Sequence, residues 1–315
     1  MVYSKNQKSA GRWSFRLKKT FQGLIKLAHF ENFFYFVMIT TLLGITSAKG
    51  RFDWQFFVLL PANWLAVGFA YMVNDIENAP NDALAANRNY RNPISTGWLS
   101  PTTARFSTFL VAISAIVLFS LLGKWPLVFG SISLLLGFLY SYRGTRLKNI
   151  LFFDIITHCL IFSGLQFLVG YFTFSPRLQP NWFWPFSFVL ALSIFSVLRK
   201  QTQICEKDDT QQSNTALILG KRVTHILMVI VLIICIFTAT VSLILVDIIP
   251  LWVFILGIIV TCVFALAQLI IRRKGKSRIR TQDVLLNSMK CAVALVLLLQ
   301  FIIPWINRGF NIKLF

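Results

Sequence analysis

Six of the eleven acidic residues of this 315-residue chain fall in two short segments, each directly after a long apolar run. They are Asp75, Glu77 and Asp82 in the first segment, and Glu206, Asp208 and Asp209 in the second. Converging carboxylate and amide oxygens suit a hard divalent cation, and Mg²⁺ typically takes one or two carboxylates plus waters and a substrate phosphate. The first segment is therefore a candidate magnesium site.

The spacing within the first segment supports this interpretation if the preceding helix continues past residue 74. At 100° per residue, five side chains then fall within about 120° of one another. They are Asn74, Asp75, Asn78, Asn81 and Asp82. Pro80 is expected to kink such a helix, because it removes one backbone hydrogen bond. The alternative interpretation is a solvated helix end in which Asn and Asp form turns.

Basic residues follow the acidic face and point to an anionic ligand. Arg91 lies in the segment after Asp82, and Arg143, Arg146 and Lys148 lie together after a later apolar run. Arginine binds phosphate oxygens with its planar fork and lysine as a point charge. A site with both metal-binding acids and such donors can hold a diphosphate. The alternative is the excess of Lys and Arg that membrane proteins carry on their cytoplasmic side.

The composition places these residues in a membrane protein. The chain is 56% hydrophobic and 13% charged, with a mean hydropathy of +0.68. Its net charge of +20 would indicate nucleic-acid binding in a soluble protein, but here the charges lie between long apolar runs, so no nucleic-acid partner is expected. The five cysteines are spread singly, which argues against a disulfide framework or a zinc site.

Nine apolar runs are long enough to cross a bilayer core of about 30 Å as helices. They cover residues 30–48, 54–74, 102–123, 126–142, 149–174, 182–198, 223–247, 249–271 and 285–306. Of the 31 Lys and Arg, 23 fall on the side that carries the N-terminus and 6 on the other. This asymmetry predicts a cytoplasmic N-terminus, cytoplasmic acidic segments and an external C-terminus.

Residues 1–29 form a basic cytoplasmic segment, and residues 30–315 form a single membrane domain. Within residues 12–28, the apolar residues from Leu17 to Ala28 recur on one helical face and the lysines lie elsewhere. This pattern predicts an amphipathic helix in the membrane interface, attached by apolar burial and anionic headgroups. A docking helix for a partner protein is the alternative.

Taken together, these segments resemble the UbiA superfamily of intramembrane prenyltransferases. The first segment is similar to the family's Asn-Asp-x-x-Asp-x-x-x-Asp motif, and it is followed by Arg91-Asn92-Pro93-Ile94. Tyr142 and Arg146 match a Tyr-x-x-x-(Lys/Arg) element after the fourth helix, and the second acidic segment matches an Asp-rich motif after the sixth. The resemblance extends from about residue 30 to 305. It implies an all-α bundle of nine transmembrane helices around a central cavity.

The resemblance also implies a reaction and roles for individual residues. A polyprenyl diphosphate would donate its prenyl group to a lipophilic or aromatic acceptor, with Mg²⁺ assisting the departure of diphosphate. Asp75, Asp82, Asp208 and Tyr142 would be catalytic, with Tyr142 stabilising an allylic cation through its ring. Diphosphate would bind Asn74, Arg91, Arg146 and Lys148. The metal ligands would be Asp75, Asn78, Asp82, Glu206, Asp208 and Asp209.

The sequence lacks one carboxylate of the family pattern in each motif, and Gln212 replaces the Gly of the second. Asn78 replaces the middle Asp of the first motif, and Ile204 stands where the second begins with Asp. Each change removes a carboxylate and should weaken cation binding, which leaves an impaired homologue as an alternative. Transfer of a sugar phosphate to a polyprenyl phosphate is another, since it uses the same groups. A membrane carrier is the third.

Two further polar residues fall inside the fifth apolar run. Asp154 is expected to pair with Arg146 or Lys148, with binding of the acceptor as the alternative, because an ionisable group inside a span is costly unless paired. His158 lies one helical turn later on the same face and is expected to be a structural, hydrogen-bonded histidine; a catalytic pair with Asp154 is the alternative.

Overall fold

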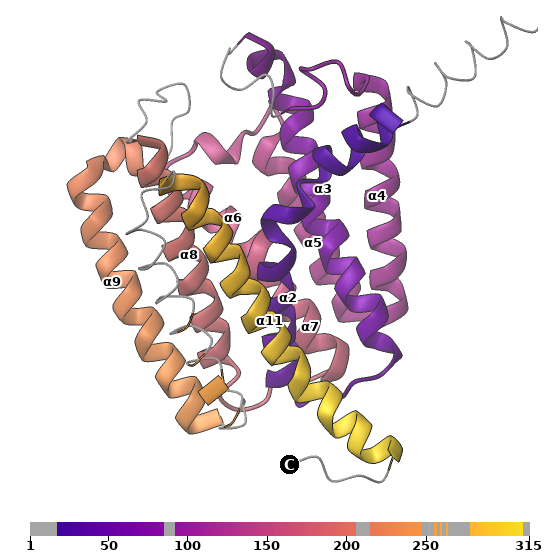
Figure 1. Cartoon of the computed structure of the whole chain (residues 1–315), viewed down its shortest axis with the longest axis vertical. Helices are drawn as coiled ribbons and strands as arrows, with labels where there is room; N and C mark the ends of the chain where they lie inside the picture. Colours follow the sequence, from indigo (N-terminus) through magenta and orange to yellow (C-terminus); the bar gives the residue numbers. More distant parts are fainter. Residues whose placement is uncertain are drawn as a thin grey trace, which may run out of the picture.

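The computed structural model describes residues 18–84, 92–205, 215–246 and 278–310, with isolated residues between 252 and 263. Every regular element in this part of the chain is helical (Figure 1). An N-terminal helix covers residues 18–28. The elements after it are α2 (Phe30–Ser47), α3 (Trp54–Leu84), α4 (Pro101–Leu122), α5 (Lys124–Ser141), the 3₁₀ turn η1 (Leu147–Asn149), α6 (Phe153–Cys159), the π-helical turn η2 (Leu160–Gly164), α7 (Leu165–Phe174), α8 (Phe183–Cys205), α9 (Thr215–Val246) and α11 (Arg278–Phe310).

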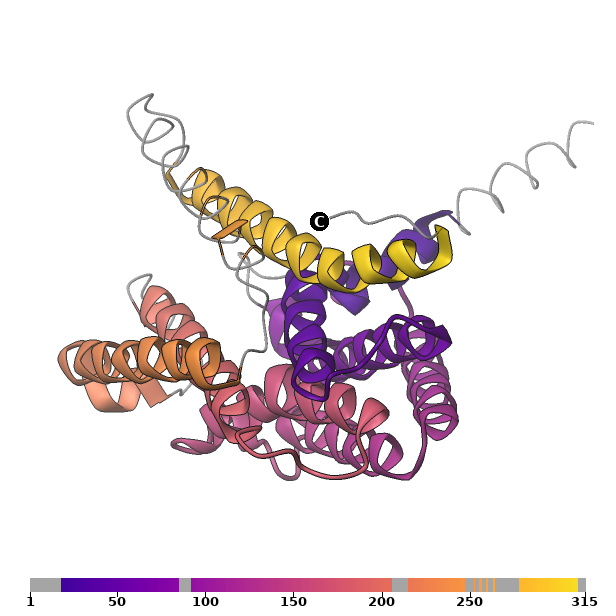
Figure 2. The ribbon, with the colours of Figure 1, turned by 90° about the horizontal axis from the view of Figure 1, so that it is seen from below.

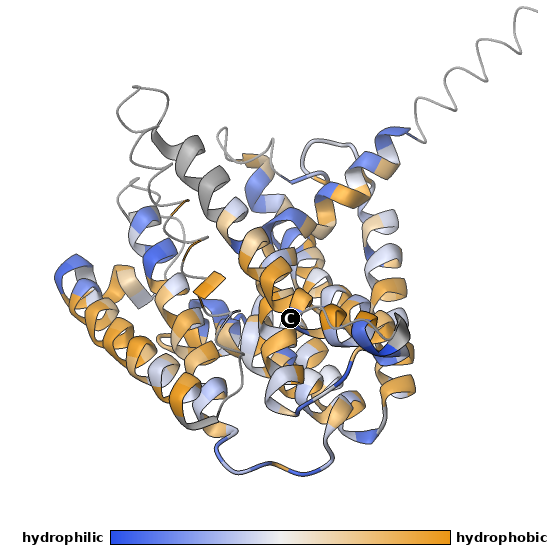
Figure 3. Cartoon of the chain, turned by 60° about the horizontal axis from the view of Figure 1, so that its bottom comes forward, coloured by the Kyte–Doolittle hydropathy of each residue, from blue (hydrophilic) through white to orange (hydrophobic). Residues whose placement is uncertain are grey.

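Within the described ranges, eight helices are long and apolar enough to cross a membrane. They match eight of the nine predicted spans, with α6, η2 and α7 forming the fifth. The remaining predicted span, 249–271, lies almost wholly outside the described residues. Hydrophobic residues cover the lengths of the helices and hydrophilic residues gather toward their ends (Figure 3), as expected for a bundle surrounded by lipid.

Helix α3 is much longer than its predicted span, and this extension carries the first acidic segment. It continues for 31 residues and keeps Pro61 and Pro80 inside the helix. At 1.5 Å per residue it is about 47 Å long, whereas a bilayer core needs about 30 Å. The expected continuation of the helix past Asn74 is therefore confirmed.

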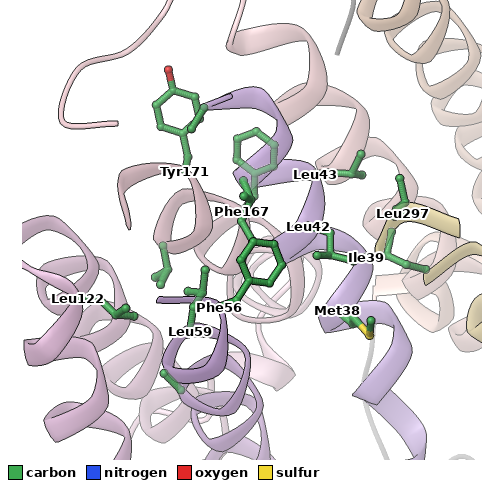
Figure 4. Packing of buried hydrophobic residues seen from close by; sticks show 14 of the residues in the cluster. Met38, Ile39, Leu42, Leu43, Phe56, Leu59, Leu122, Phe167, Tyr171 and Leu297 are labelled. Atoms are coloured by element: carbon green, nitrogen blue, oxygen red, sulfur yellow. The ribbon is translucent and has the colours of Figure 1, made fainter. Parts of the chain in front are cut away.

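The core of the bundle is built around α2, whose side chains pack against α3, α7 and α11 (Figure 4). Helices α2 and α7 cross in backbone contact. A Cβ at Gly44 would lie 2.2 Å from the Phe167 carbonyl oxygen, and one at Gly170 would lie 2.7 Å from the Thr41 carbonyl oxygen. Only glycine permits such an approach, which is a common basis for helix association in membranes. Seen from below, α8 and α9 lie to one side of this group and α11 crosses α2 (Figure 2).

Polar side chains join four helices in the buried interior. Asn63 of α3 donates to the Thr41 hydroxyl of α2 at 2.7 Å, and Gln166 of α7 donates to the Ser133 hydroxyl of α5 at 3.0 Å. Gln166 also donates to the Ile161 carbonyl at 2.7 Å, within the π-helical turn. Hydrogen bonds of this kind fix the relative register of helices that lipid alone would not align.

The N-terminal helix lies against the end of the bundle that carries the extension of α3. Leu27 is fully buried against Met72 and Leu99, whereas Phe21 and Ile25 are 65% and 56% exposed. The Lys26 ammonium lies 5.0 Å from the centre of the Trp98 ring. One apolar face of this helix is therefore used in packing, and a second apolar patch remains uncovered.

Candidate active site

The extended end of α3 carries carboxylate and amide side chains whose oxygen atoms could bind a metal ion. Asp75 is only 7% exposed, and Asn78 Nδ2 donates to the Asn74 Oδ1 atom at 3.1 Å, one helical turn away. Asp82 is partly buried at the next turn. The spacing of these four residues on one continuous helix places their side chains on one face, as the sequence predicts.

Asn92 connects the two carboxylate residues of this face. Its Nδ2 donates to the Asp82 Oδ2 atom at 2.9 Å and to the Asp75 carbonyl oxygen at 2.8 Å. Its Oδ1 accepts from the Ile94 amide at 3.0 Å, which fixes the side chain before Pro93. Asn92 thus holds Asp82 against the helix turn that begins at Asp75.

His29 reaches the same carboxylate from the N-terminal side. Its Nε2 atom hydrogen-bonds Asp75 Oδ2 at 2.8 Å, and its ring centre lies 5.3 Å from that of Tyr71. His29 separates the N-terminal helix from α2 and has a left-handed backbone with φ 50. No sequence pattern singles out this histidine, because 46 positions separate it from Asp75.

The basic segment after α5 contacts the amide residues of the acidic face. Lys148 Nζ donates to Asn74 Oδ1 at 2.8 Å and to Asn78 Oδ1 at 2.9 Å, and the Ser141 hydroxyl donates to Asn74 Oδ1 at 3.2 Å. Burial, reinforced by the neighbouring charge of Arg146, lowers the pKa of Lys148 from its usual value to about 8. The predicted convergence of the acidic and basic segments is therefore present in the structure.

Arg146 has a buried donor, its Nε atom, that makes no hydrogen bond among the described residues. Buried N–H groups are normally paired, so this guanidinium nitrogen, close to the second cation Lys148, is a candidate donor to an anion. Arg143, by contrast, pairs with Glu77 at 3.3 Å on a largely exposed side chain, an arrangement that contributes little.

The Tyr142 ring is partly exposed and contacts its own helix. It is 42% exposed, and its ring stacks on Phe138 at 4.8 Å between ring centres. Tyr71 lies beside the acidic face. Its ring packs against the rings of His29, Phe33 and Phe162, and His29 bonds Asp75.

Asp154 does not make the expected ion pair. Its carboxylate is 2% exposed and accepts hydrogen bonds from Gln201 Nε2 at 2.8 Å, from the Thr215 amide at 2.9 Å and from the Thr215 hydroxyl. Neutral donors therefore satisfy the charge in place of Arg146 or Lys148. The expectation was wrong because it considered only cations close in sequence, whereas Thr215 lies 61 positions away.

His158 packs through its ring. The ring stacks on Phe162 with 4.1 Å between centres and lies 6.3 Å from that of Tyr140. Asp154 bonds to none of these residues and is fully occupied elsewhere. The described contacts therefore give no support to a catalytic Asp–His pair.

The remaining predicted residues lie outside the described part of the chain. They are Arg91, Glu206, Asp208 and Asp209. Among the residues that the structure does describe, no three His, Cys, Asp or Glu side chains form a group that could hold a metal ion. The second acidic segment is bounded by α8 and by Thr215, and the bonds of Asp154 place both of these boundaries at the end of the bundle where Lys148 lies.

Comparison with known proteins decides the family. The sequence matches the UbiA prenyltransferase family over residues 37–290. The chain belongs to this family. It is therefore an integral membrane transferase of prenyl groups, as the order of its motifs predicts. A comparison with curated proteins finds no match.

Solved structures share the UbiA fold at low sequence identity. A structure of digeranylgeranylglyceryl phosphate synthase is 16% identical with a TM-score of 0.61, and the match covers 88% of this chain and 97% of that one. A UbiA homologue from Archaeoglobus fulgidus bound to GPP and Mg²⁺ is 14% identical with a TM-score of 0.56, covering 93% and 91%. An apo homologue from Aeropyrum pernix K1 is 11% identical with a TM-score of 0.63, covering 86% and 98%.

The donor set of this UbiA chain fits a magnesium diphosphate. Asp75 and Asp82 carry carboxylate oxygens, the ligand type that Mg²⁺ prefers. Lys148 and the Nε of Arg146, which has no acceptor among the described residues, are groups that could donate to phosphate oxygens. Sequence reasoning found these residues but missed His29, the hydrogen-bond partner of Asp75, because only a tertiary contact reveals it.

Proposed function

We propose that this UbiA protein transfers a polyprenyl group from an isoprenoid diphosphate to a lipophilic or aromatic acceptor, with Mg²⁺ as cofactor and diphosphate as the other product. The observation that carries the proposal is the junction of the two segments. Lys148 contacts Asn74 and Asn78 directly, and Arg146 beside it has a buried donor with no acceptor in the part of the chain that the structure describes. A diphosphate between these cations and the nearby carboxylates would satisfy both sets of charges.

Each group would act on the diphosphate in its own way. Lys148 and Arg146 would donate to phosphate oxygens and stabilise the charge that develops as the carbon–oxygen bond breaks. Asp75 and Asp82 would hold magnesium from one side, and Glu206, Asp208 and Asp209 from the other, with Asn78 as an amide ligand. Bound Mg²⁺ supplies a Lewis acid for the leaving diphosphate. Arg91 would add a further cation.

The prenyl chain would lie among the aromatic residues below the acidic face. Phe33 and Phe162 are almost completely buried and enclose the Tyr71 ring. An allylic cation formed here would be shielded from water, and aromatic faces attract such a cation by about 0.5–2 kcal/mol each. Tyr142 would stabilise the allylic cation only if its ring turned inward from Phe138. Tyr71 is therefore the better-placed residue for this role.

We also propose that the helix of residues 18–28 lies in the cytoplasmic interface. Phe21 and Ile25 form an exposed apolar patch, and Lys18 is exposed beside it. Apolar burial combined with basic residues attaches helices to anionic lipid surfaces. The active-site end of the bundle would then face the cytoplasm and the C-terminus the opposite side, as the distribution of Lys and Arg predicts.

The test is a transfer assay with the purified protein. Labelled prenyl diphosphates of several lengths are incubated with a panel of acceptors, in Mg²⁺ or in EDTA. Prenylated product is expected only with Mg²⁺. The variants Asp75→Asn and Asp82→Asn should each lower kcat/KM by at least about 100-fold, the scale seen when charge-stabilising groups are removed.

Asp53→Asn is the matched control, because Asp53 precedes the other end of α3 and bonds only its own turn, through the Gln55 amide. It should retain wild-type activity. Transfer that persists in EDTA and in the Asp75→Asn variant contradicts the proposal. Transfer of a sugar phosphate to a polyprenyl phosphate, or concentrative uptake into vesicles without product, would replace it with one of the two rival functions. An inactive wild-type protein that still binds prenyl diphosphate would indicate an impaired homologue.

A further inference from the structure

His29 hydrogen-bonds the buried carboxylate of the acidic face, and the mechanism above gives it no role. Its Nε2 atom lies 2.8 Å from the Oδ2 atom of Asp75, and the two side chains are 22% and 10% exposed. Within the described ranges, no other group donates a hydrogen bond to this carboxylate. The contact therefore occupies one oxygen of Asp75 and leaves the second oxygen without a donor.

Asn32 determines which ring nitrogen of His29 carries the proton. The Asn32 Nδ2 atom lies 3.2 Å from His29 Nδ1, and an amide nitrogen donates hydrogen bonds but does not accept them. Nδ1 is therefore the accepting nitrogen, and the proton of the neutral ring is on Nε2, from which it is donated to Asp75. A carboxylate that accepts such a directed bond is restricted in its rotation.

The packing of the N-terminal helix sets the position of the His29 ring. His29 joins this helix to α2 with a left-handed backbone, and Leu27, two positions earlier, is fully buried against Met72 of α3. The His29 ring also packs against Tyr71, with 5.3 Å between ring centres. Tyr71 and Met72 lie about one helical turn before Asp75. The backbone and the ring of His29 are thus both fixed against the turn of α3 that leads into the acidic face.

These contacts form one continuous path. Asn32 donates to His29, and His29 donates to Asp75. From this geometry we infer that His29 is a positioning residue: it holds the Asp75 carboxylate in the orientation that binds the metal ion. The imidazole would itself touch neither the metal nor the diphosphate.

This inference rests on the proposed function, because it takes Asp75 as a magnesium ligand. Hydrogen bonds that orient a metal ligand from outside the coordination shell typically change metal affinity by about 10- to 100-fold when they are removed. Loss of the His29 ring should therefore weaken metal binding. A ring that competed with the metal for the carboxylate would have the opposite effect, because its removal would strengthen metal binding.

The first measurement is binding of Mn²⁺, used as a paramagnetic probe for the magnesium site, to purified protein in the presence of a prenyl thiodiphosphate. His29→Leu should raise the Kd for Mn²⁺ by about 10- to 100-fold. His29→Gln should restore most of the lost affinity, because its amide nitrogen can replace Nε2 as the donor. His225→Leu is the matched control and should bind as the wild type does, because His225 is exposed and bonds the Lys221 carbonyl of its own helix.

The second measurement needs neither metal nor substrate. The chain has three histidines, so protein labelled with ¹⁵N-histidine gives few ring signals, and His29→Gln identifies those of residue 29. We expect Nδ1 to be the unprotonated nitrogen and Nε2 to carry the proton. Asp75→Asn should shift the Nε2 signal, and Asn32→Leu should shift the Nδ1 signal.

Asn32→Leu also replaces His29→Leu if the latter does not fold. It leaves the imidazole in place but removes the donor that selects its tautomer, so it should raise the Kd for Mn²⁺ in the same direction and by a smaller factor. An Asn32→Leu protein with unchanged Mn²⁺ affinity and an unchanged Nδ1 signal contradicts the path from Asn32 to Asp75.

Several outcomes would overturn the positioning role. In His29→Leu, a Mn²⁺ affinity that is unchanged while the melting temperature falls would make the contact one of packing only, and a stronger affinity would make the ring a competitor of the metal. A loss of kcat at saturating metal that His29→Gln does not restore, with unchanged Mn²⁺ affinity, would make His29 a proton acceptor in the reaction.

The proposed function fails separately, if the wild-type protein binds no Mn²⁺ and forms no product. The ring signals then still decide whether His29 donates to Asp75, because that measurement uses the protein alone.

Discussion

The lowered pKa of Lys148 predicts how binding of the prenyl diphosphate depends on pH. Only the protonated amine attracts a phosphate oxygen, and burial together with Arg146 lowers its pKa to about 8. In the free protein, about 90% of Lys148 is then protonated at pH 7 and about 10% at pH 9. A bound diphosphate favours the charged form, so its affinity falls as pH rises through 8. Between pH 7 and pH 9, the donor KM should rise by about tenfold.

The assay is the initial rate of prenyl transfer at saturating acceptor and Mg²⁺, measured at half-unit intervals from pH 6.5 to 9.5. Lys148→Arg is the control, because arginine stays protonated over this range while the ionisation of diphosphate and the availability of magnesium change equally for both proteins. The ratio of the two donor KM values therefore reports Lys148 alone. A ratio that stays constant from pH 7 to pH 9 would refute the placement of this amine on the diphosphate.

Three further predictions follow from other parts of the structure. Gly44→Ala should destabilise the protein by at least about 2 kcal/mol, because the new Cβ would lie 2.2 Å from a carbonyl oxygen of α7. Thermal unfolding in detergent measures this loss of stability. Gly68→Ala is the control and should be nearly neutral, because its Cβ would make only an ordinary contact at 3.6 Å. Asn78→Asp should lower the Mg²⁺ concentration for half-maximal transfer by about three- to tenfold, since it adds a carboxylate to the acidic face. Asn81→Asp, at an exposed position, should leave this concentration unchanged. An unchanged Mg²⁺ titration in Asn78→Asp would show that residue 78 is not a metal ligand. In a variant without native cysteines, a thiol placed within residues 1–17 should react with an impermeant reagent only from the cytoplasmic side, and the opposite result would reverse the proposed orientation.

Most of the architecture was predictable because a bilayer imposes simple rules. Each span must be apolar over about 20 residues and must satisfy its own backbone, so composition alone locates the helices. The end of α3 was harder to predict. Its polar residues and Pro80 resemble a turn, but side chains outside the helix take up carbonyls near the proline, as Asn92 does at Asp75 and Ser95 at Ala79. These bonds hold the helix turn that precedes the proline against the following segment, and no local sequence pattern predicts them.

The residues of the candidate site were predictable in part, but the contacts between them were not. Asn74, Asp75, Arg146 and Lys148 were recognisable from residue type, order and spacing. The contact of His29 with Asp75 depends on how the N-terminal helix packs against the bundle. The bonds of Asp154 to Thr215 depend on how α9 is placed, so a prediction based on nearby sequence chose the wrong partners. Contacts that cross many positions are fixed by packing, which a single sequence does not reveal.

The glycine crossing of α2 and α7 constrains how a hydrophobic substrate reaches the interior. Where the Cα atom of Gly44 faces the Phe167 carbonyl, the two backbones leave no width for a hydrocarbon chain. Side chains can rotate aside, but main chains in contact cannot part without separating the helices. If the proposed function is right, a polyprenyl tail diffusing in the leaflet would have to enter between other helices of the bundle, where side chains rather than main chains form the contact.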